Sequence, residues 1–256
     1  MKTSKVCYNR TMKILGIIPA RFASTRFPGK PLTLINGVSM IERVYKRALL
    51  SKNLSTVLIA TDDERIAEHV NTFGGNVMMT RTDHASGTDR CAEVLVNQTT
   101  AFDVVINIQG DEPFIQPEQI DLLISCFDDN EVQIATLIKK IISVNELNNE
   151  NTPKVVIAQN GDALYFSRQA IPFKKNVAIE EWLKHGTYFK HIGIYGYKAV
   201  VLPKLTLLPH GRAEILESLE QLRWLENGYR IRTKVTDLET IAIDTPDDLA
   251  KAEKYF

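Results

Sequence analysis

Residues 14–31 read ILGIIPARFASTRFPGKP, and this stretch decides the fold. It opens with an apolar run that ends at Pro19, as expected of a strand buried on both faces of a sheet. Small and turn-forming residues follow, together with the cations Arg21, Arg26 and Lys30. The backbone N–H groups of such a loop can face an anion while the cations neutralise its charge. We therefore predict a phosphate-binding loop at the carboxyl end of a first parallel strand; the alternative is a solvated basic loop.

The composition excludes several classes of protein. Lys and Arg together number 31, as do Asp and Glu, so the charge balance gives no indication of a nucleic-acid or membrane partner. No apolar run reaches the length of a membrane span, and the polar residues 1–11 lack the apolar segment of a secretory signal. Cys7, Cys91 and Cys126 form no CxxC pair, and the last two fall on apolar helix faces. We therefore expect core thiols in a reducing cytoplasm, with no nucleic-acid and no membrane partner.

Strand and helix patterns alternate through the first half of the chain, which is typical of a parallel sheet built from βαβ units. We expect further strands at residues 57–60, 76–80, 104–108, 155–158, 163–166, 191–197, 229–235 and 241–243. We expect helices with the apolar faces Met40/Ile41/Val44/Tyr45/Ala48/Leu49, Ile66/Val70/Phe73, Cys91/Val94/Leu95 and Ile120/Leu123/Ile124/Phe127, and two more at residues 214–227 and 246–255. Ser39 and Asp62 are the expected N-caps of the first two helices, and residues 145–151 and 174–187 are expected to be irregular.

The predicted architecture is an α/β fold with a Rossmann-like, mostly parallel central sheet flanked by helices. The pattern changes after Lys139, which predicts a small antiparallel lobe at about residues 145–200 for substrate binding or dimerisation. We expect residues 1–12 to be a disordered extension and residues 13–256 to form a single domain.

Two carboxylates follow predicted strands. Residues 109–113, QGDEP, come directly after a buried strand, so their polar groups emerge at the sheet edge where α/β proteins bind ligands. A carboxylate at Asp111 can hold Mg²⁺ against substrate phosphates, or Asp111 and Glu112 only favour the start of the next helix. Asp244 also follows an apolar run and either holds a metal or caps a helix.

Residues 81–88, RTDHASGT, precede a predicted helix. They can present Ser86 and Gly87 at the helix N-terminus to a nucleotide, or they form a capping loop with Ser86 or Thr88 as N-cap. His84 has no partner at zinc-binding spacing, and we expect it to form a hydrogen bond within the loop.

The second half of the chain offers candidates whose alternatives stay open. Arg168 can pair with a carboxylate through two hydrogen bonds, or form a surface ion pair. His191 and Tyr195 lie four apart on a predicted strand and so share a face, which also suits an aromatic core. Glu220 and Gln221 fall in the middle of a predicted helix, where polar residues normally face solvent.

Several longer motifs carry a resemblance to a known family. They are IIPARFASTRFPGKPL, RTDHASGTDR, NIQGDEP, ALYFSRQAIPF, HIGIYGYK, LEQLRWLENG and AIDTPDDL. Together they resemble the sugar-activating nucleotidyltransferases, and among them the 3-deoxy-manno-octulosonate (Kdo) cytidylyltransferases. The motifs occur in the family's order from about Ile14 to the C-terminus.

The resemblance implies roles for individual residues. It implies a nucleotide site that contains Ala20, Arg21, Ser24, Arg26, Lys30, Arg81, Ser86, Gly87 and Gln109. It implies catalytic roles for Arg21, Lys30, Asp111 and Asp244, the last two as ligands of Mg²⁺. It implies a sugar-acid site that contains Arg168, His191, Tyr195, Glu220 and Gln221. Residues 209–213, PHGRA, depart from the Ser-Pro-Leu-type segment usual in the family, which leaves the sugar site less defined there.

The implied activity joins CTP and Kdo to give CMP-Kdo and pyrophosphate, for lipopolysaccharide biosynthesis, in a cytoplasmic homodimer that uses Mg²⁺. A sister enzyme acting on 8-amino-Kdo or a sialic acid is one alternative. A non-catalytic nucleotide-binding regulator is another, although it would be expected to lack one of the two carboxylates, and both Asp111 and Asp244 are present.

Overall fold

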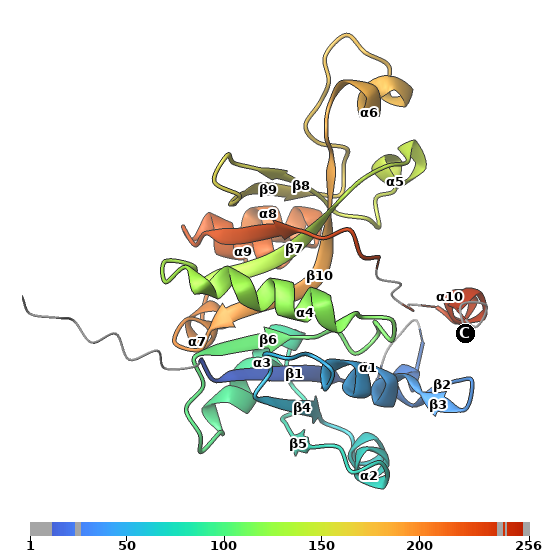
Figure 1. Cartoon of the computed structure of the whole chain (residues 1–256), viewed down its shortest axis with the longest axis vertical. Coiled ribbons are helices and arrows are strands. Elements are labelled where there is room, and N and C mark those ends of the chain that lie inside the picture. Colours follow the sequence, from blue (N-terminus) through green and yellow to red (C-terminus); the bar gives the residue numbers. More distant parts are fainter. Residues whose placement is uncertain (1–11, 24–26, 240–242, 244, 253–256) are drawn as a thin grey trace, which may run out of the picture.

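The apolar run of residues 14–20 forms β1, the strand at the centre of the parallel part of the sheet. The computed structural model describes residues 12–23, 27–239, 243 and 245–252 (Figure 1). Among these residues one sheet has the strand order β11-β7-β10-β6-β1-β4-β5, with β8 paired to β10 and β9 paired to β8. It contains β1 (Ile14–Ala20), β4 (Thr56–Thr61), β5 (Val77–Met79), β6 (Val104–Asn107), β7 (Ile134–Lys140), β8 (Lys154–Ile157), β9 (Ala163–Ser167), β10 (Phe189–Lys198) and β11 (Ile231–Val235); a separate hairpin contains β2 (Leu34–Ile35) and β3 (Val38–Ser39).

Along the path β11-β7-β10-β6-β1-β4-β5, four of the six strand pairs are parallel, and the two antiparallel pairs both involve β10. β1 runs parallel to both β4 and β6, and β11 runs parallel to β7. β10 is antiparallel to both of its long neighbours, β6 and β7. The predicted α/β fold with a mostly parallel central sheet is confirmed.

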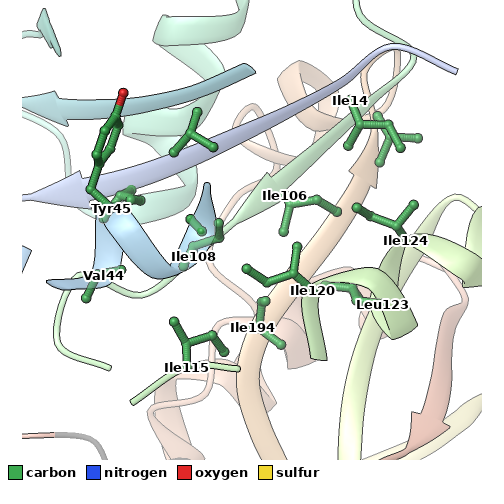
Figure 2. Packing of buried hydrophobic residues seen from close by; sticks show 14 of the residues in the cluster. Ile14, Val44, Tyr45, Ile106, Ile108, Ile115, Ile120, Leu123, Ile124 and Ile194 are labelled. Carbon is green, nitrogen blue, oxygen red and sulfur yellow. The ribbon is translucent and has the colours of Figure 1, made fainter. Parts of the chain in front are cut away.

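The helices cover both faces of the sheet, since side chains along a strand alternate between faces. They are α1 (Met40–Ala48), α2 (Glu64–Thr72), α3 (Gly87–Val96), α4 (Pro117–Ile124), α5 (Val144–Asn148), α6 (Trp182–His185), α7 (Leu202–Leu205), α8 (Arg212–Glu217), α9 (Gln221–Glu226) and α10 (Pro246–Ala252), with the 3-10 turns η1 (Lys30–Leu32), η2 (Ser125–Asp128) and η3 (Ile179–Glu181). Ile14 and Ile18 of β1 pack with α1, α2 and α4 on one face. Figure 2 shows part of this packing, with Val44 and Tyr45 of α1 and Ile120 and Leu123 of α4. Leu15 and Ile17 pack with α3, α7 and α9 on the other.

The caps of the first helices follow the sequence with one correction. Ser39 caps α1 as predicted, its Oγ accepting a hydrogen bond from the Glu42 N–H. The predicted cap of α2, Asp62, is wrong: Asp63 is the N-cap and accepts from the Arg65 N–H at 3.0 Å. Leu49, assigned to the apolar face of α1, lies just past its end and is 53% exposed.

The lobe differs from its prediction in three places. β8 and β9 form the expected antiparallel pair around residues 160–162. However, residues 145–151, expected to be irregular, overlap helix α5, and the expected loop at residues 174–187 contains η3 and α6. β10 lies within residues 145–200 but belongs to the central sheet, because it pairs with β6. The lobe is therefore β8, β9, α5 and α6, which gather at one end of the molecule (Figure 1).

The second half of the chain holds one more correction. The continuous helix predicted over residues 214–227 is wrong, because Ser218 adopts a left-handed conformation (φ 51°) that separates α8 from α9. Gly228, with φ 79°, ends α9 as its position predicts. The strand expected at residues 241–243 falls largely outside the described residues, as do residues 1–11 of the expected N-terminal extension. Among the described residues, no helix combines the length and apolar character that a membrane crossing needs.

Candidate active site

A cavity of about 240 Å³ opens where β1 and β6 end, at the carboxyl edge of the sheet. Its lining combines the ends of these strands with η1 and the start of α3. The lining residues are Pro19, Ala20, Arg21, Lys30, Pro31, His84, Ala85, Ser86, Gly87, Arg90, Gln109, Gly110 and Asp111. We call it the edge cavity. The fold therefore brings together most of the nucleotide-site residues predicted from the sequence, although they come from three separate segments.

The loop after β1 presents Arg21 and Lys30 to the edge cavity. Gly29 has φ 71° and donates its N–H to the Phe22 carbonyl at 3.0 Å, which closes the loop before Lys30. The Lys30 ammonium then reaches across to Asp111 Oδ2 at 2.7 Å. Two of the predicted loop residues, Ser24 and Arg26, lie outside the described residues.

The second wall comes from the turn after β6. A Cβ placed on Gly110 would lie 2.8 Å from the Pro19 carbonyl oxygen, closer than real Cβ atoms approach. Only glycine therefore lets this turn pack directly against the end of β1, and this contact places Gln109 and Asp111 on the cavity wall.

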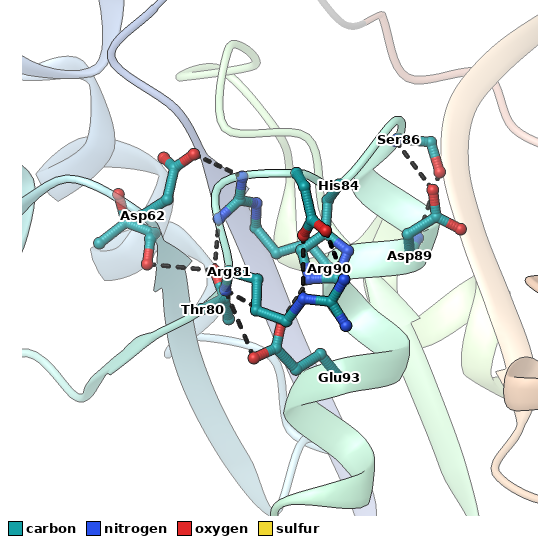
Figure 3. Close-up of polar contacts among 10 residues, drawn as sticks. Asp62, Thr80, Arg81, His84, Ser86, Asp89, Arg90 and Glu93 are labelled. Atoms are coloured by element: carbon teal, nitrogen blue, oxygen red, sulfur yellow. Dashed lines mark hydrogen bonds and ion pairs between the residues drawn. The ribbon is translucent and has the colours of Figure 1, made fainter.

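The third wall is the N-terminus of α3 (Figure 3). Ser86 is its N-cap: Ser86 Oγ accepts from the Asp89 N–H at 3.1 Å, and Asp89 Oδ2 accepts from the Ser86 N–H at 3.0 Å. The capping interpretation is thus correct for Ser86, which nonetheless lines the cavity together with Gly87. His84 forms a hydrogen bond, as expected, but its partner is Glu93 of α3 and not a residue of the loop.

One predicted cation faces elsewhere, and an unpredicted one lines the cavity. The Arg81 guanidinium pairs with Asp83 and is largely exposed, away from the edge cavity. Arg90, one turn into α3, is 4% exposed and lines the cavity. It bonds to Asp62 Oδ2 at 3.0 Å and to the Thr80 hydroxyl (Figure 3), so the carboxylate predicted as a cap neutralises a buried arginine instead.

A second set of buried polar side chains lies on β6, β10 and α9, together with Glu112 in the turn after β6. The atoms without a hydrogen-bond partner among the described residues are Asn107 Oδ1, Glu112 Oε2, Tyr195 Oη, Tyr197 Oη, Gln221 Nε2 and Trp224 Nε1. We call these six residues the polar cluster. Asn107 and Tyr195 are direct neighbours in the β6–β10 ladder, and the Trp224 ring packs edge-on against Tyr195 with centroids 5.1 Å apart. Burial raises the pKa of both tyrosines well above its usual value, so both hydroxyls keep their protons.

His191 and Tyr195 lie side by side, as predicted, in spite of an irregularity in β10. The register against β7 shifts between Ile192 and Tyr195, with two extra residues in β10. An even number of insertions keeps both side chains on one face, and their ring centroids are 5.1 Å apart. Burial lowers the pKa of His191 to about 3, so its ring is neutral at neutral pH.

The tautomer of His191 follows from its neighbour Thr136. The Thr136 hydroxyl donates its single proton to the Ile194 carbonyl at 2.7 Å. It must therefore accept from His191 Nε2 at 2.9 Å, which places the ring proton on Nε2 and leaves a lone pair on Nδ1.

The remaining predicted residues of the second half separate into two places. Glu220 caps the start of α9, where its Oε2 accepts from the Thr88 hydroxyl at 2.8 Å, and burial raises its pKa. Gln221 belongs to the polar cluster. Arg168 instead donates to main-chain carbonyls, those of Glu217 at 2.7 Å and Ser218 at 3.2 Å among them.

The comparisons with known proteins agree with this geometry. The sequence model of the cytidylyltransferase family matches residues 15–235. The chain belongs to the cytidylyltransferase family. It is 54% identical over 247 residues to the 3-deoxy-manno-octulosonate cytidylyltransferase of Bacteroides thetaiotaomicron, covering 95% of this chain and 98% of the relative. The enzyme of the same description from Porphyromonas gingivalis is 52% identical over 246 residues, covering 95% of this chain and 96% of the relative. The solved structure of CMP:2-keto-3-deoxy-manno-octonic acid synthetase in complex with CTP matches with a TM-score of 0.88 at 43% identity, covering 95% of this chain and 98% of that one.

A divalent metal in the edge cavity of this cytidylyltransferase would find one carboxylate among the described lining residues, that of Asp111. Asp111 lines the edge cavity and is 29% exposed, so it can offer oxygen to a hard cation beside phosphates. No group of three or more His, Cys, Asp or Glu side chains within the described ranges could hold a metal unaided. The second predicted ligand, Asp244, lies outside the described residues; Ile243, directly before it in sequence, donates its N–H to the Asp111 carbonyl at 2.9 Å.

Sequence reasoning missed several residues of this cytidylyltransferase site. Asn107 carried a signal, since it is the one polar residue in the apolar strand β6. Glu112 did not: its burial, and next the charge of Asp111, raise its pKa to about 8, and neither is visible in a linear pattern. Arg90, Tyr197 and Trp224 read as ordinary helix or strand residues until their neighbours are known.

Proposed function

We propose that the chain transfers a cytidylyl group from CTP to 3-deoxy-D-manno-octulosonate, giving CMP-Kdo and pyrophosphate for lipopolysaccharide biosynthesis. The support comes from relatives of that description over nearly the whole chain, and from the CTP complex of a 43% identical protein. The same solved structure supports CTP as the nucleotide.

The observation that carries the proposal is that the edge cavity adjoins the polar cluster. A Cβ placed on Gly193 would lie 3.6 Å from Glu112 Oε1 and 3.7 Å from Gln109 Cγ. On the other side, a Cβ on Gly87 would lie 3.8 Å from the Asn107 amide nitrogen. A cationic cavity suited to phosphates therefore borders a buried set of groups that seek hydrogen bonds, as a polyhydroxylated acid could supply.

The chain's own residues can carry out the transfer mainly by positioning and charge. The anomeric hydroxyl oxygen of the sugar acid bonds to the α-phosphorus while the bond from that phosphorus to the bridging oxygen breaks. Pyrophosphate leaves with the electron pair, and the hydroxyl proton passes to water. Arg21 and Lys30 lie where they can hold the triphosphate and neutralise the charge that grows on the leaving group. Ser86, Gly87 and Gln109 are placed to bind the cytidine, the Gln109 amide being able to donate and accept at a pyrimidine edge.

The sugar acid would bind at His191, Tyr195, Glu220 and Gln221. The Tyr195 hydroxyl of the polar cluster can donate a hydrogen bond, and His191 Nδ1 can accept one. Arg168 uses three of its five N–H groups on the carbonyls of Glu150, Glu217 and Ser218, so one on each terminal nitrogen can still meet a carboxylate.

Magnesium is part of the proposal, with Asp111 and Asp244 as its protein ligands. When bound there, Mg²⁺ supplies a Lewis acid that polarises the α-phosphate and lowers the pKa of the attacking hydroxyl. The Lys30–Asp111 ion pair holds the Asp111 carboxylate toward the cavity before substrate arrives.

A substrate panel tests the function. The enzyme is incubated with CTP, Mg²⁺ and either Kdo, 8-amino-Kdo or a sialic acid, and pyrophosphate release is measured together with the CMP-sugar by mass spectrometry. We expect Kdo to have the highest kcat/KM. A preference for another acid would overturn the sugar assignment, and absence of product with every acid would overturn the activity. Omission of Mg²⁺ with added EDTA should abolish turnover.

We also propose a cytoplasmic homodimer. Large apolar side chains are exposed on the neighbouring elements β9 and α8, namely Leu164, Ile215 and Leu216, each at least 60% exposed. Such side chains on adjoining elements suit a self-complementary interface. Cys91 and Cys126 are buried free thiols, which suits a reducing compartment. Light scattering at micromolar concentration should give about twice the chain mass of 28.9 kDa, and a monomer would contradict the dimer.

A further inference from the structure

The junction between α8 and α9 is held in an unusual backbone conformation. Ser218 has φ 51° and ψ 47°, a left-handed conformation that costs a residue with a side chain about 1–2 kcal/mol. An uninterrupted helix would turn by about 100° per residue through this point and would direct residues 220 and 221 differently. The break therefore decides which way the start of α9 faces.

The end of β9 is hydrogen-bonded to this junction through the Glu217 carboxylate. Both oxygens of the Glu217 carboxylate are used: Oε1 accepts from the Ser167 hydroxyl at 2.7 Å, and Oε2 from the Arg168 N–H at 2.9 Å. In return, the Arg168 guanidinium donates to the last carbonyls of the junction, those of Glu217 and Ser218. Hydrogen bonds between a helix end and charged partners are stronger than neutral ones.

The junction directly precedes the proposed sugar-acid residues Glu220 and Gln221 in the chain. Two residues after Ser218, Glu220 reaches Thr88 at the start of α3, beside the edge cavity. Gln221 is 5% exposed and its amide nitrogen has no partner among the described residues. Glu217 itself points at β9, so it is separated from these groups by the left-handed turn.

We propose that Glu217 is a positioning residue of the sugar-acid site, anchoring the turn at Ser218 to β9 and thereby setting the direction of Glu220 and Gln221. This inference rests on the proposed function. It assigns Glu217 no contact with substrate, so its removal should loosen sugar binding and leave nucleotide binding intact.

The test compares Glu217→Gln and Glu217→Ala with Glu118→Gln, the same chemical change at an exposed position of α4. Steady-state kinetics with each substrate varied in turn should give a KM for Kdo raised about fivefold to twentyfold in both Glu217 variants. The KM for CTP and kcat should change less than twofold, and the control should match the wild type. An unchanged KM for Kdo in Glu217→Ala would overturn the proposal.

A rescue experiment separates positioning from a distant effect of charge. Ser218→Gly lowers the cost of the left-handed turn, so adding it to Glu217→Gln should recover part of the lost affinity for Kdo. If the double variant binds Kdo no better than Glu217→Gln, the proposal fails, because loss of charge alone would then explain the defect.

Hydrogen exchange measures how stably the turn is held in the absence of substrate. The amides of Leu222 and Arg223 donate to Leu219 and Glu220 in the first turn of α9, so they should exchange faster in Glu217→Ala than in the wild type. Equal exchange would contradict the anchoring role. A wild-type enzyme that makes no CMP-Kdo would instead contradict the proposed function, and this exchange result would still decide on the anchor.

Discussion

The edge cavity and the polar cluster differ in whether their polar groups have partners. In the edge cavity two of the cations are already paired: Lys30 with Asp111, and Arg90 with Asp62. In the polar cluster, buried atoms such as Tyr195 Oη and Gln221 Nε2 have no partner among the described residues. Ion pairs keep charges stable in an open cavity until phosphates replace one partner. Buried neutral groups left unpaired cost about 1–3 kcal/mol each, and a ligand that pairs them recovers that free energy on binding.

The difference predicts different consequences of mutation. A change in the edge cavity should act mainly on turnover, because charges there respond to charge that develops during the reaction. Removal of an unpaired polar group from the polar cluster should act mainly on sugar binding. It should weaken binding of the sugar acid and raise the stability of the free enzyme.

The largest effect is expected for Asp111→Asn. The Asp111 carboxylate is both the ion-pair partner of Lys30 and a proposed ligand of Mg²⁺, and this change removes its negative charge from the edge cavity. We therefore expect kcat to fall about a thousandfold. Pyrophosphate release at saturating Mg²⁺ measures it, and circular dichroism should report an unchanged fold. Turnover within tenfold of the wild type would refute the role of Asp111.

Lys30→Ala should follow. The ammonium stabilises leaving pyrophosphate more than bound CTP, so kcat should fall by one to three decades, about 2–4 kcal/mol, with a smaller change in the KM for CTP. The KM for Kdo should hardly change. Lys46→Ala, at an exposed ion pair of α1, serves as the control. A rise in the KM for Kdo alone would assign the loop to the wrong substrate.

Tyr195→Phe should weaken binding and stabilise the protein. Losing an unpaired buried hydroxyl should raise the KM for Kdo about tenfold, while the free enzyme gains up to about 1 kcal/mol in urea unfolding. Tyr45→Phe is the matched control, because the Tyr45 hydroxyl accepts from the Asn76 N–H at 3.0 Å and its removal should destabilise. If both variants destabilise equally, the contrast between paired and unpaired groups is wrong.

The pH dependence of stability should carry a contribution from His191. Burial lowers its pKa from 6.5 to about 3, so between these values the unfolded state binds the extra proton, and stability falls as the pH falls below 6.5. At pH 5 this loss should be about 1 kcal/mol, reduced because the ring is partly exposed. Urea unfolding at pH 7.5 and pH 5.0 should show a smaller loss in His191→Gln, with His185→Gln on α6 as control. The same loss in both variants would contradict this contribution.

The smallest effect is expected for Arg65→Ala. The Arg65 guanidinium lies 3.4 Å from the ring centroid of Phe22, at the base of the loop that carries Lys30. An exposed cation–π contact contributes about 0.5–1 kcal/mol, so the KM for CTP should rise about fivefold at most. Arg65→Lys should retain part of the contact, so its KM for CTP should lie between those of the wild type and Arg65→Ala. A KM for CTP identical in all three enzymes would show that the contact does not order the loop.

Local patterns in the sequence determined the elements and the edge cavity. The buried run of β1, the caps Ser39 and Ser86, and the positions of Gly29 and Asp111 after strands all depend on neighbours within a few residues. Because parallel strands end at one edge, residues predicted separately at strand ends meet there once the sheet forms. The resemblance of long motifs supplied the family, and the comparisons confirmed it.

Only the tertiary structure decided what surrounds these elements. The pattern of residues 214–227 is helical throughout, and the break at Ser218 depends on Glu217 meeting β9, some 50 positions earlier in the chain. The buried Arg90 guanidinium at the edge cavity is neutralised by Asp62, which comes from a distant segment of the chain. The polar cluster forms because β6, β10 and α9 come together in the fold. Contacts between distant segments leave no periodic trace in a sequence, since each residue type remains compatible with an ordinary helix or strand.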